Sequence, residues 1–204
     1  MSANKTPAAM AAEAPCKPRV RDRIFETACD LFYQQGIRAV GVDTIASEAG
    51  TNKMSFYRSF SSKDDLVAEY LRQQVRELWE WWDEVVAKHP DDARTQIMDL
   101  FGAFVTKNCD TDVRGCALGN AAVEIREHDH PAHPVILEYK SELRKRWHSL
   151  AKRTGARKHE QLGDALMLLQ EGGMQSRLVF CGVSGPLKNA VHAAQSLIKA
   201  HLDC

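Results

Sequence analysis

Side chains that can donate hydrogen bonds or carry positive charge gather between residues 44 and 63 of this sequence. The donors are Thr44, Asn52, Lys53, Ser55, Tyr57, Arg58 and Lys63, and Met54 lies among them. Lysine, tyrosine and hydroxyl groups suit phosphates, whereas an arginine guanidinium can donate two parallel hydrogen bonds to guanine. These residue types indicate contact with a phosphate-bearing polymer.

Two short helices joined by a glycine turn would position these side chains together. Val42 and Ile45 begin an apolar pattern with the spacing of one helix face. Gly50 can end this helix, because glycine readily adopts the left-handed conformation. A second helix over about residues 53–59 turns Phe56 inward and its polar side chains outward. Two helices that meet at such a turn form a helix-turn-helix unit, whose second helix enters the major groove of DNA.

The charge of the chain is unevenly distributed. The 204 residues carry no net charge, and 44% of them are hydrophobic, enough for a sizeable core. Residues 17–63 contain eight Lys or Arg against five Asp or Glu, whereas residues 64–204 contain eighteen against twenty-one. A weakly basic N-terminal part on a weakly acidic remainder fits a phosphate-binding surface confined to one end.

Membrane insertion and secretion are not expected. The sequence has no run of 18 apolar residues, and its start lacks the charged-then-apolar order of a secretory signal. The six cysteines are scattered without CxxC spacing, so reduced thiols are expected rather than a disulfide framework. We therefore expect a cytoplasmic protein.

Helical periodicity recurs along the rest of the chain, and no segment shows sustained strand alternation. The sequence predicts an all-α fold of about nine helices. Residues 1–16 are expected to form a disordered tail, residues 17–63 the helix-turn-helix domain, and residues 64–204 a helical body. The expected helices cover about residues 18–35, 42–49, 52–59, 63–88, 91–107, 116–126, 134–153, 158–180 and 186–202.

These features together resemble the tetracycline-repressor (TetR) family of bacterial transcription regulators. The resemblance is strongest over about residues 20–66 and weaker in the segments 115–125 and 130–136. The residues that carry it are Ile24, Ala28, Leu31, Phe32, Gly36, Val42, Ile45, Ala46, Ala49, Gly50, the block 53–60, Lys63 and Leu66. Met54 stands where the family commonly has glycine, and Gly41 where it has a Ser or Thr cap, so an operator sequence cannot be transferred.

The resemblance implies a homodimeric, ligand-responsive repressor without catalysis or a cofactor. Each subunit would place its recognition helix on a half-site of a palindromic operator. A small effector bound in the body would then change the separation or mobility of the two heads and release the DNA. The last two helices are rich in small residues and are expected to form the contact between subunits.

Aromatic and methionine residues of the body could line an effector pocket. The candidates are Trp82, Met98, Phe101, Phe104, Cys116, Met167 and Met174, with Asn120 and Glu124 as polar anchors. Helical spacing favours an ordinary core position for most of the apolar candidates.

Two alternatives to an effector-controlled repressor rest on cysteine and histidine. Cys109 and Cys116 lie on either side of an expected loop and could form a redox switch, although buried or idle thiols are the favoured interpretation. Glu124 with His128, His130 and His133 could suggest a metal-dependent enzyme, or Cys116 a thiol enzyme. The two nearby prolines indicate a surface loop with solvated histidines, so neither a metal site nor an enzyme is the favoured prediction.

Overall fold

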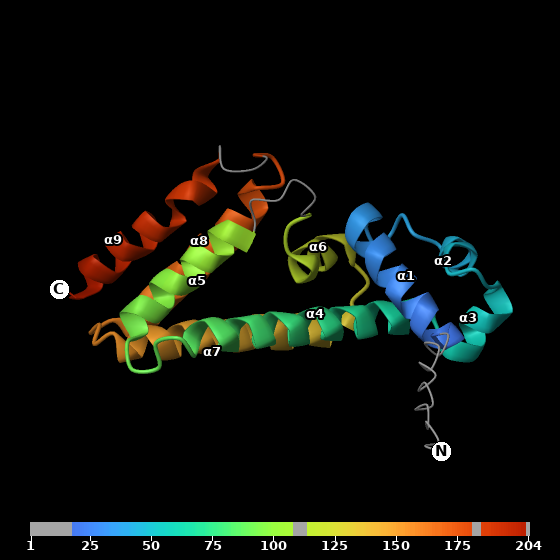
Figure 1. The fold of residues 1–204 in the computed structure, drawn as a ribbon, viewed down its shortest axis with the longest axis horizontal. Coiled ribbons are helices and arrows are strands. Elements are labelled where there is room, and N and C mark those ends of the chain that lie inside the picture. The colour runs from blue at the N-terminus through green and yellow to red at the C-terminus, as the bar shows by residue number, and fades with distance from the viewer. Residues whose placement is uncertain (1–17, 108–113, 181–184, 203–204) are drawn as a thin grey trace, which may run out of the picture.

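The computed structural model describes residues 18–107, 114–180 and 185–202. Within these ranges the protein is all-α and has no strand (Figure 1), which confirms the expected fold class. The helices are α1 (Val20–Gln35), α2 (Val42–Glu48), α3 (Lys53–Ser59), α4 (Lys63–Val86), α5 (Ala93–Lys107), α6 (Ala117–Glu124), α7 (Ala132–Arg153), α8 (His159–Ser176), the short 3-10 helix η2 (Pro186–Asn189) and α9 (Ala190–Leu202).

The largest differences from the expected boundaries lie at turns rich in glycine and proline. α8 ends at Ser176, shortly after Gly172 and Gly173, and not at residue 180. The last helix starts with a 3-10 turn at Pro186 and becomes α-helical only at Ala190. Glycine lowers helix propensity and proline lacks an N–H donor, so both displace helix ends from where apolar spacing alone puts them.

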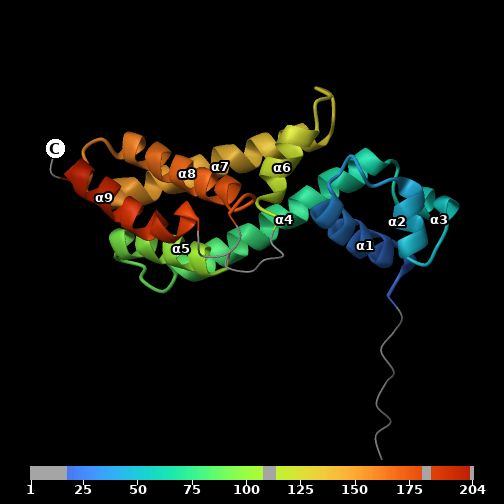
Figure 2. The same cartoon turned by 90° about the horizontal axis from the view of Figure 1, so that it is seen from above.

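Helices α1, α2 and α3 pack into a small N-terminal head. Ile24, Ile45 and Phe56, one from each helix, are fully buried between them. The helix-turn-helix geometry follows from the turn after α2, where Gly50 has φ of +64° and the backbone N–H of Thr51 donates to the carbonyl of Ala46. This head lies at one end of the elongated molecule (Figure 2).

Helix α4 runs from the head into the body (Figure 1). Ser62 caps it by accepting a hydrogen bond from the backbone N–H of Asp65 at 3.0 Å. Its 24 residues span about 36 Å at the usual rise per residue. Arg21 of α1 forms a 2.7 Å ion pair with Glu69 of α4, so the head is attached to the first half of this helix.

In the body, α5 and α7 pack against α4, α8 packs on α7, and α9 packs against α5 and α8. Trp147 lies at its centre, with ring centroids 4.8 Å from Trp82 and 5.4 Å from Phe101. α7 and α8 approach closely at Gly163, where an added Cβ would lie 2.9 Å from the backbone of His148. None of the helices described is long and apolar enough to cross a membrane.

Candidate nucleic-acid interface and ligand cavity

Helix α3 presents a row of exposed side chains at the end of the head. Asn52 caps this helix, because its Oδ1 accepts a 2.9 Å hydrogen bond from the backbone N–H of Ser55. Phe56 and Phe60 hold the opposite face in the core. Lys53, Met54, Tyr57 and Arg58 therefore face solvent, with Met54 and Tyr57 exposed to 68% and 52%.

Some of the predicted contact residues also have partners within the protein. Lys53 Nζ pairs with Asp43 Oδ2 of α2 at 3.1 Å, but both side chains remain more than half exposed. Thr44 is exposed on α2. Lys63 is half-buried, with Nζ 6.0 Å from the Phe32 ring centroid, and burial lowers its pKa. The side chains of Asn52 and Lys63 thus have structural contacts in addition to any part they play in binding.

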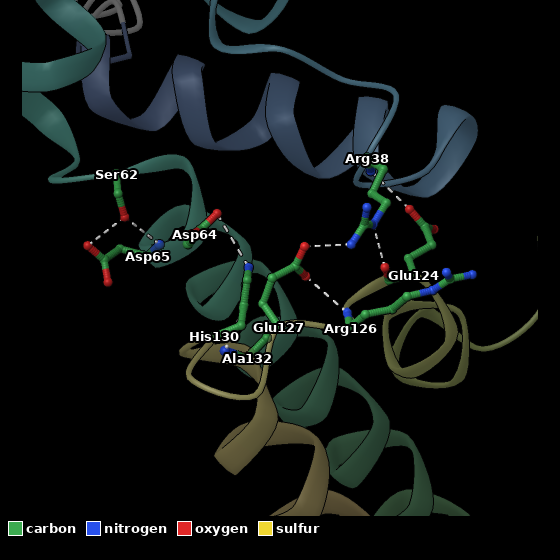
Figure 3. Close-up of polar contacts among 9 residues, drawn as sticks. All are labelled: Arg38, Ser62, Asp64, Asp65, Glu124, Arg126, Glu127, His130 and Ala132. Atoms are coloured by element: carbon green, nitrogen blue, oxygen red, sulfur yellow. Dashed lines mark hydrogen bonds and ion pairs between the residues drawn. The ribbon is translucent and has the colours of Figure 1, made fainter.

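A polar junction ties the head to helix α6, as Figure 3 shows. The backbone N–H of Arg38 donates to Glu124 Oε2 at 2.9 Å, and its Nε donates to the Glu124 carbonyl at 2.6 Å. The same guanidinium pairs with Glu127 at 2.6 Å. Hydrogen bonds from the backbone of residues 126 and 127, followed by the charge and hydrogen bond of Arg38, hold the pKa of Glu127 below its usual value. The junction therefore holds the C-terminal end of α6 against the loop after α1.

Gly36 is required at this junction for two reasons. Its φ is +90°, a conformation that side chains rarely adopt, and an added Cβ would lie 3.1 Å from Glu124 Oε1. We predict that Gly36→Ala lowers the free energy of unfolding by about 2 to 3 kcal/mol, measured by denaturant titration. Gly50→Ala is the matched control, since Gly50 also has positive φ but open space around it, and should cost about 1 kcal/mol. Equal losses for the two variants would contradict a role of Glu124 in this constraint.

The histidines of the neighbouring loop differ in their surroundings. His128 is exposed, whereas His130 is buried and its Nδ1 accepts from the backbone N–H of Ala132 at 3.1 Å. His130 Nε2 lies 3.4 Å from Asp64 Oδ1 (Figure 3), and His133 Nε2 is buried with no hydrogen-bond partner. The expectation of solvated loop histidines is wrong for His130, which helps to attach the loop to α4. In the described part of the chain no three His, Cys, Asp or Glu side chains are grouped so that they could hold a metal ion.

A cavity of about 410 Å³ lies where the head meets the body. Its walls come from α1, α4, α5, α6, α7 and α8. The lining residues are Cys29, Asp30, Tyr33, Tyr70, Gln74, Glu77, Leu78, Trp81, Phe104, Gly115, Cys116, Ala117, Leu118, Tyr139, Gln170, Glu171 and Met174. This volume is in the usual range for small-molecule sites.

Three of the nine residues predicted for an effector pocket line this cavity, namely Phe104, Cys116 and Met174. Trp82 and Phe101 pack instead against Trp147 in the core. Met98 lies at a surface hollow beside α4, and Met167 packs at the edge of the core.

The two predicted polar anchors have other partners. The Asn120 amide donates to the carbonyl of Arg114 at 2.7 Å, and Glu124 belongs to the junction with Arg38. The cavity residues that sequence reasoning missed include Cys29, Asp30 and Tyr33 of α1. Cys29 and Tyr33 come directly after the buried residues Ala28 and Phe32 of α1. No local pattern in the sequence indicates that this side of α1 also contacts the body.

The thiol of Cys29 should be unreactive in the folded protein. Burial, followed by the charges of Asp30 and Glu77, raises its pKa to about 12. Since the thiolate is the reactive form, it should be a fraction of about 10⁻⁴ at pH 8. We predict alkylation by iodoacetamide at pH 8 at least about 100-fold more slowly in the native protein than in guanidinium, where the ordinary pKa returns. Mass spectrometry of the Cys29 peptide provides the rate, and similar rates in the two states would contradict the shift.

The proposed redox pair is only partly within the described ranges. Cys109 lies outside them. Cys116 is half-buried at the start of α6, where its Sγ accepts from the backbone N–H of Gly119 at 3.4 Å. The disulfide hypothesis therefore stays a prediction.

Comparisons with known proteins agree with this geometry. A profile described as bacterial regulatory proteins, tetR family, matches residues 24–70. The crystal structure of a TetR-family transcriptional regulator from Streptomyces coelicolor has a TM-score of 0.78 and 27% identity, covering 90% of this chain and 94% of that chain.

Curated relatives match over only part of this chain. The transcriptional repressor KstR2 of Mycolicibacterium smegmatis is 31% identical over 97 residues, which make up 47% of this chain and 45% of that protein. KstR2 of Rhodococcus jostii is 36% identical over 75 residues, 37% of each chain. The matched region thus spans less than half the length of either relative.

Proposed function

We propose that this chain, which belongs to the TetR family of bacterial regulatory proteins, is a homodimeric transcriptional repressor that leaves a palindromic operator when a small effector fills its cavity. Residues 17–63 form the DNA-binding domain, and residues 64–204 form the effector-binding and dimerisation domain. The protein acts in the cytoplasm and performs no catalysis. The curated repressors match this chain over less than half of their length. Repression, as opposed to activation, is therefore proposed here and not taken from those relatives.

The observation that carries this proposal is the exposed row on α3. Lys53, Met54, Tyr57 and Arg58 project from one short helix whose other face is fixed by buried Phe56. A rigid helix that carries cationic and hydrogen-bonding groups at a protruding end of the molecule suits the major groove. Arg58 is suited to guanine, Met54 to a thymine methyl group, and Thr44, Tyr57 and Lys63 to phosphates.

Helix α6 supports control of the head by an effector. Its first turn contributes Ala117 and Leu118 to the cavity, and its last residue, Glu124, binds the head through Arg38. The cavity also touches the head directly through Tyr33 of α1. A ligand that displaces either wall would therefore change how the head is held. In two bound subunits such a change alters the spacing of the recognition helices, which must match half-sites about one helical turn apart.

The exposed face of α8 supports the predicted dimer. Ala165, Leu168 and Gly172 follow one another at the spacing of a single helix face, and Leu168 is 72% exposed. An added Cβ at Gly172 would meet no atom within 4 Å, so this glycine leaves space beside Leu168. An apolar side chain flanked by small residues suits close packing against the same helix of a second copy.

The proposal is tested by selecting fragments of DNA from the source genome with the purified full chain. We expect enrichment of a short palindromic sequence, which should bind in a gel-shift assay with two subunits per site. Fragments that share no sequence, or binding that competitor DNA of random sequence removes completely, would contradict the proposed function.

A further inference from the structure

The cavity between head and body has an uneven charge. Asp30 of α1 and Glu77 of α4 line it as exposed carboxylates, and Glu171 of α8 lines it as an ion pair with Lys140. No Lys or Arg is found among the lining residues that the structure describes. The carboxylates of Asp30 and Glu77 therefore have no cationic partner in the cavity wall.

The field of these carboxylates is evident at a neighbouring group. The thiol of Cys29, which also lines the cavity, has its pKa raised first by burial and then by Asp30 and Glu77. The same field that disfavours a thiolate stabilises a positive charge placed nearby.

Aromatic rings make up much of the remaining wall. Tyr33, Trp81 and Tyr139 line the cavity from three different helices. The faces of such rings attract ammonium groups and pack against apolar groups equally well. A wall of rings next to carboxylates therefore suits a ligand that is both cationic and apolar.

Two polar side chains that line the cavity keep hydrogen-bond donors unused within the described ranges. The Tyr70 side chain is 2% exposed, and no hydrogen bond to its hydroxyl exists within the described ranges. Gln170 is 6% exposed, and its Oε1 accepts from Trp147 Nε1 at 2.8 Å, which leaves the amide N–H groups unused. A ligand with a hydrogen-bond acceptor could therefore accept from one of these donors and gain a hydrogen bond with the cavity wall.

We propose that the cavity binds an organic cation, an apolar molecule that carries a protonated amine or a quaternary ammonium group and at least one hydrogen-bond acceptor. The carboxylates of Asp30 and Glu77 neutralise the charge, the aromatic rings surround the apolar part, and Tyr70 or Gln170 donates to the acceptor. The inference rests on the proposed function only in naming this ligand as the effector, since cation binding itself requires no DNA.

Calorimetric titration of the full chain without DNA tests the charge requirement with three probes of equal acyl length. Hexanoylcholine is the cation, 3,3-dimethylbutyl hexanoate is its neutral isostere, and hexanoate is an anion. We expect saturable binding of one hexanoylcholine per subunit, at least about tenfold tighter than the neutral ester and tighter still than hexanoate. Equal or tighter binding of the neutral ester, or no binding of hexanoylcholine, would overturn the proposal.

A variant pair assigns the effect to the cavity. The double variant Asp30→Asn with Glu77→Gln keeps the size of both side chains. It should weaken the binding of hexanoylcholine by at least about tenfold and leave the affinity for the neutral ester unchanged. Glu80→Gln removes an exposed carboxylate from the same helix α4 outside the cavity and should leave both affinities as they were. An unchanged cation affinity in the double variant would also overturn the proposal. A negative result in these titrations would not contradict operator binding, which the DNA selection tests. A negative result in the DNA selection would not contradict cation binding, because the titrations contain no DNA.

Discussion

Replacing Lys53 and Arg58 together by alanine should weaken specific operator binding by at least about 1000-fold. Each side chain is expected to contribute about 1 kcal/mol or more through a base or phosphate contact, and a dimer presents each of them twice. Both side chains are exposed on α3, so their truncation removes little packing in the head. Fluorescence anisotropy with the selected operator measures the loss, and circular dichroism and the melting temperature check that the fold remains.

The matched control removes two positive charges from the other end of the molecule. Arg157 and Lys158 are exposed in the turn between α7 and α8, remote from the head (Figure 1). Their double alanine variant should bind the operator within about twofold of the original protein, because phosphate attraction at that distance is screened by salt. Full specific affinity in the Lys53 and Arg58 variant would exclude α3 as the recognition helix.

The single variants separate two kinds of contact. Loss of a phosphate contact by Lys53→Ala should weaken binding to all DNA sequences similarly and reduce the salt dependence of binding. Loss of a guanine contact by Arg58→Ala should instead relax the sequence preference at one position of each half-site. Lys53 also pairs with Asp43 of α2. The Lys53 variant should therefore be compared with Asp43→Ala, which removes the pair but keeps the cation.

Leu168→Glu should convert the protein from a dimer into a monomer at micromolar concentration. Leu168 is 72% exposed on α8 between the small residues Ala165 and Gly172. In a twofold interface each substitution occurs twice, so two carboxylates would be buried without cations, at a cost of several kcal/mol. Sedimentation velocity gives the oligomeric state, and operator affinity should fall with the loss of the paired head.

Leu137→Glu is the control for this prediction. Leu137 is 69% exposed on α7, so the same change of residue is made at equal exposure on a helix outside the proposed interface. This variant should remain dimeric. A dimeric Leu168→Glu protein would exclude the α8 face from the contact between subunits, and dissociation of both variants would place the contact elsewhere than proposed.

The helix-turn-helix of the head was predictable because the residues that specify it lie close together in the sequence. Apolar residues at helical spacing, one glycine turn and the exposed polar row on α3 all lie within about 20 consecutive residues. Phe56 and Phe60 are buried as the spacing predicts, with exposed fractions of 0% and 6%. Gly36 was identified as a helix end, but its second role at Glu124 depends on a residue 88 positions away.

The ligand cavity was predictable only in part. Phe104, Cys116 and Met174 were among the candidates because they are apolar residues of the body, and the same criterion also selected Trp82 and Phe101, which are core. Periodicity identifies which face of a helix is buried, but it does not say whether another side chain or an empty space lies against that face.

The sequence by itself therefore determined the all-α class and the helix-turn-helix unit, because short-range spacing and turn residues specify them, and the residues of this unit carry the resemblance to the TetR family. The tertiary structure alone decided that α1 shares a cavity with the body, that Arg38 binds the end of α6, and that Asp30 and Glu77 face the same cavity. These contacts join residues far apart in the chain. Their existence depends on how whole helices pack, and this packing leaves no periodic pattern in the sequence.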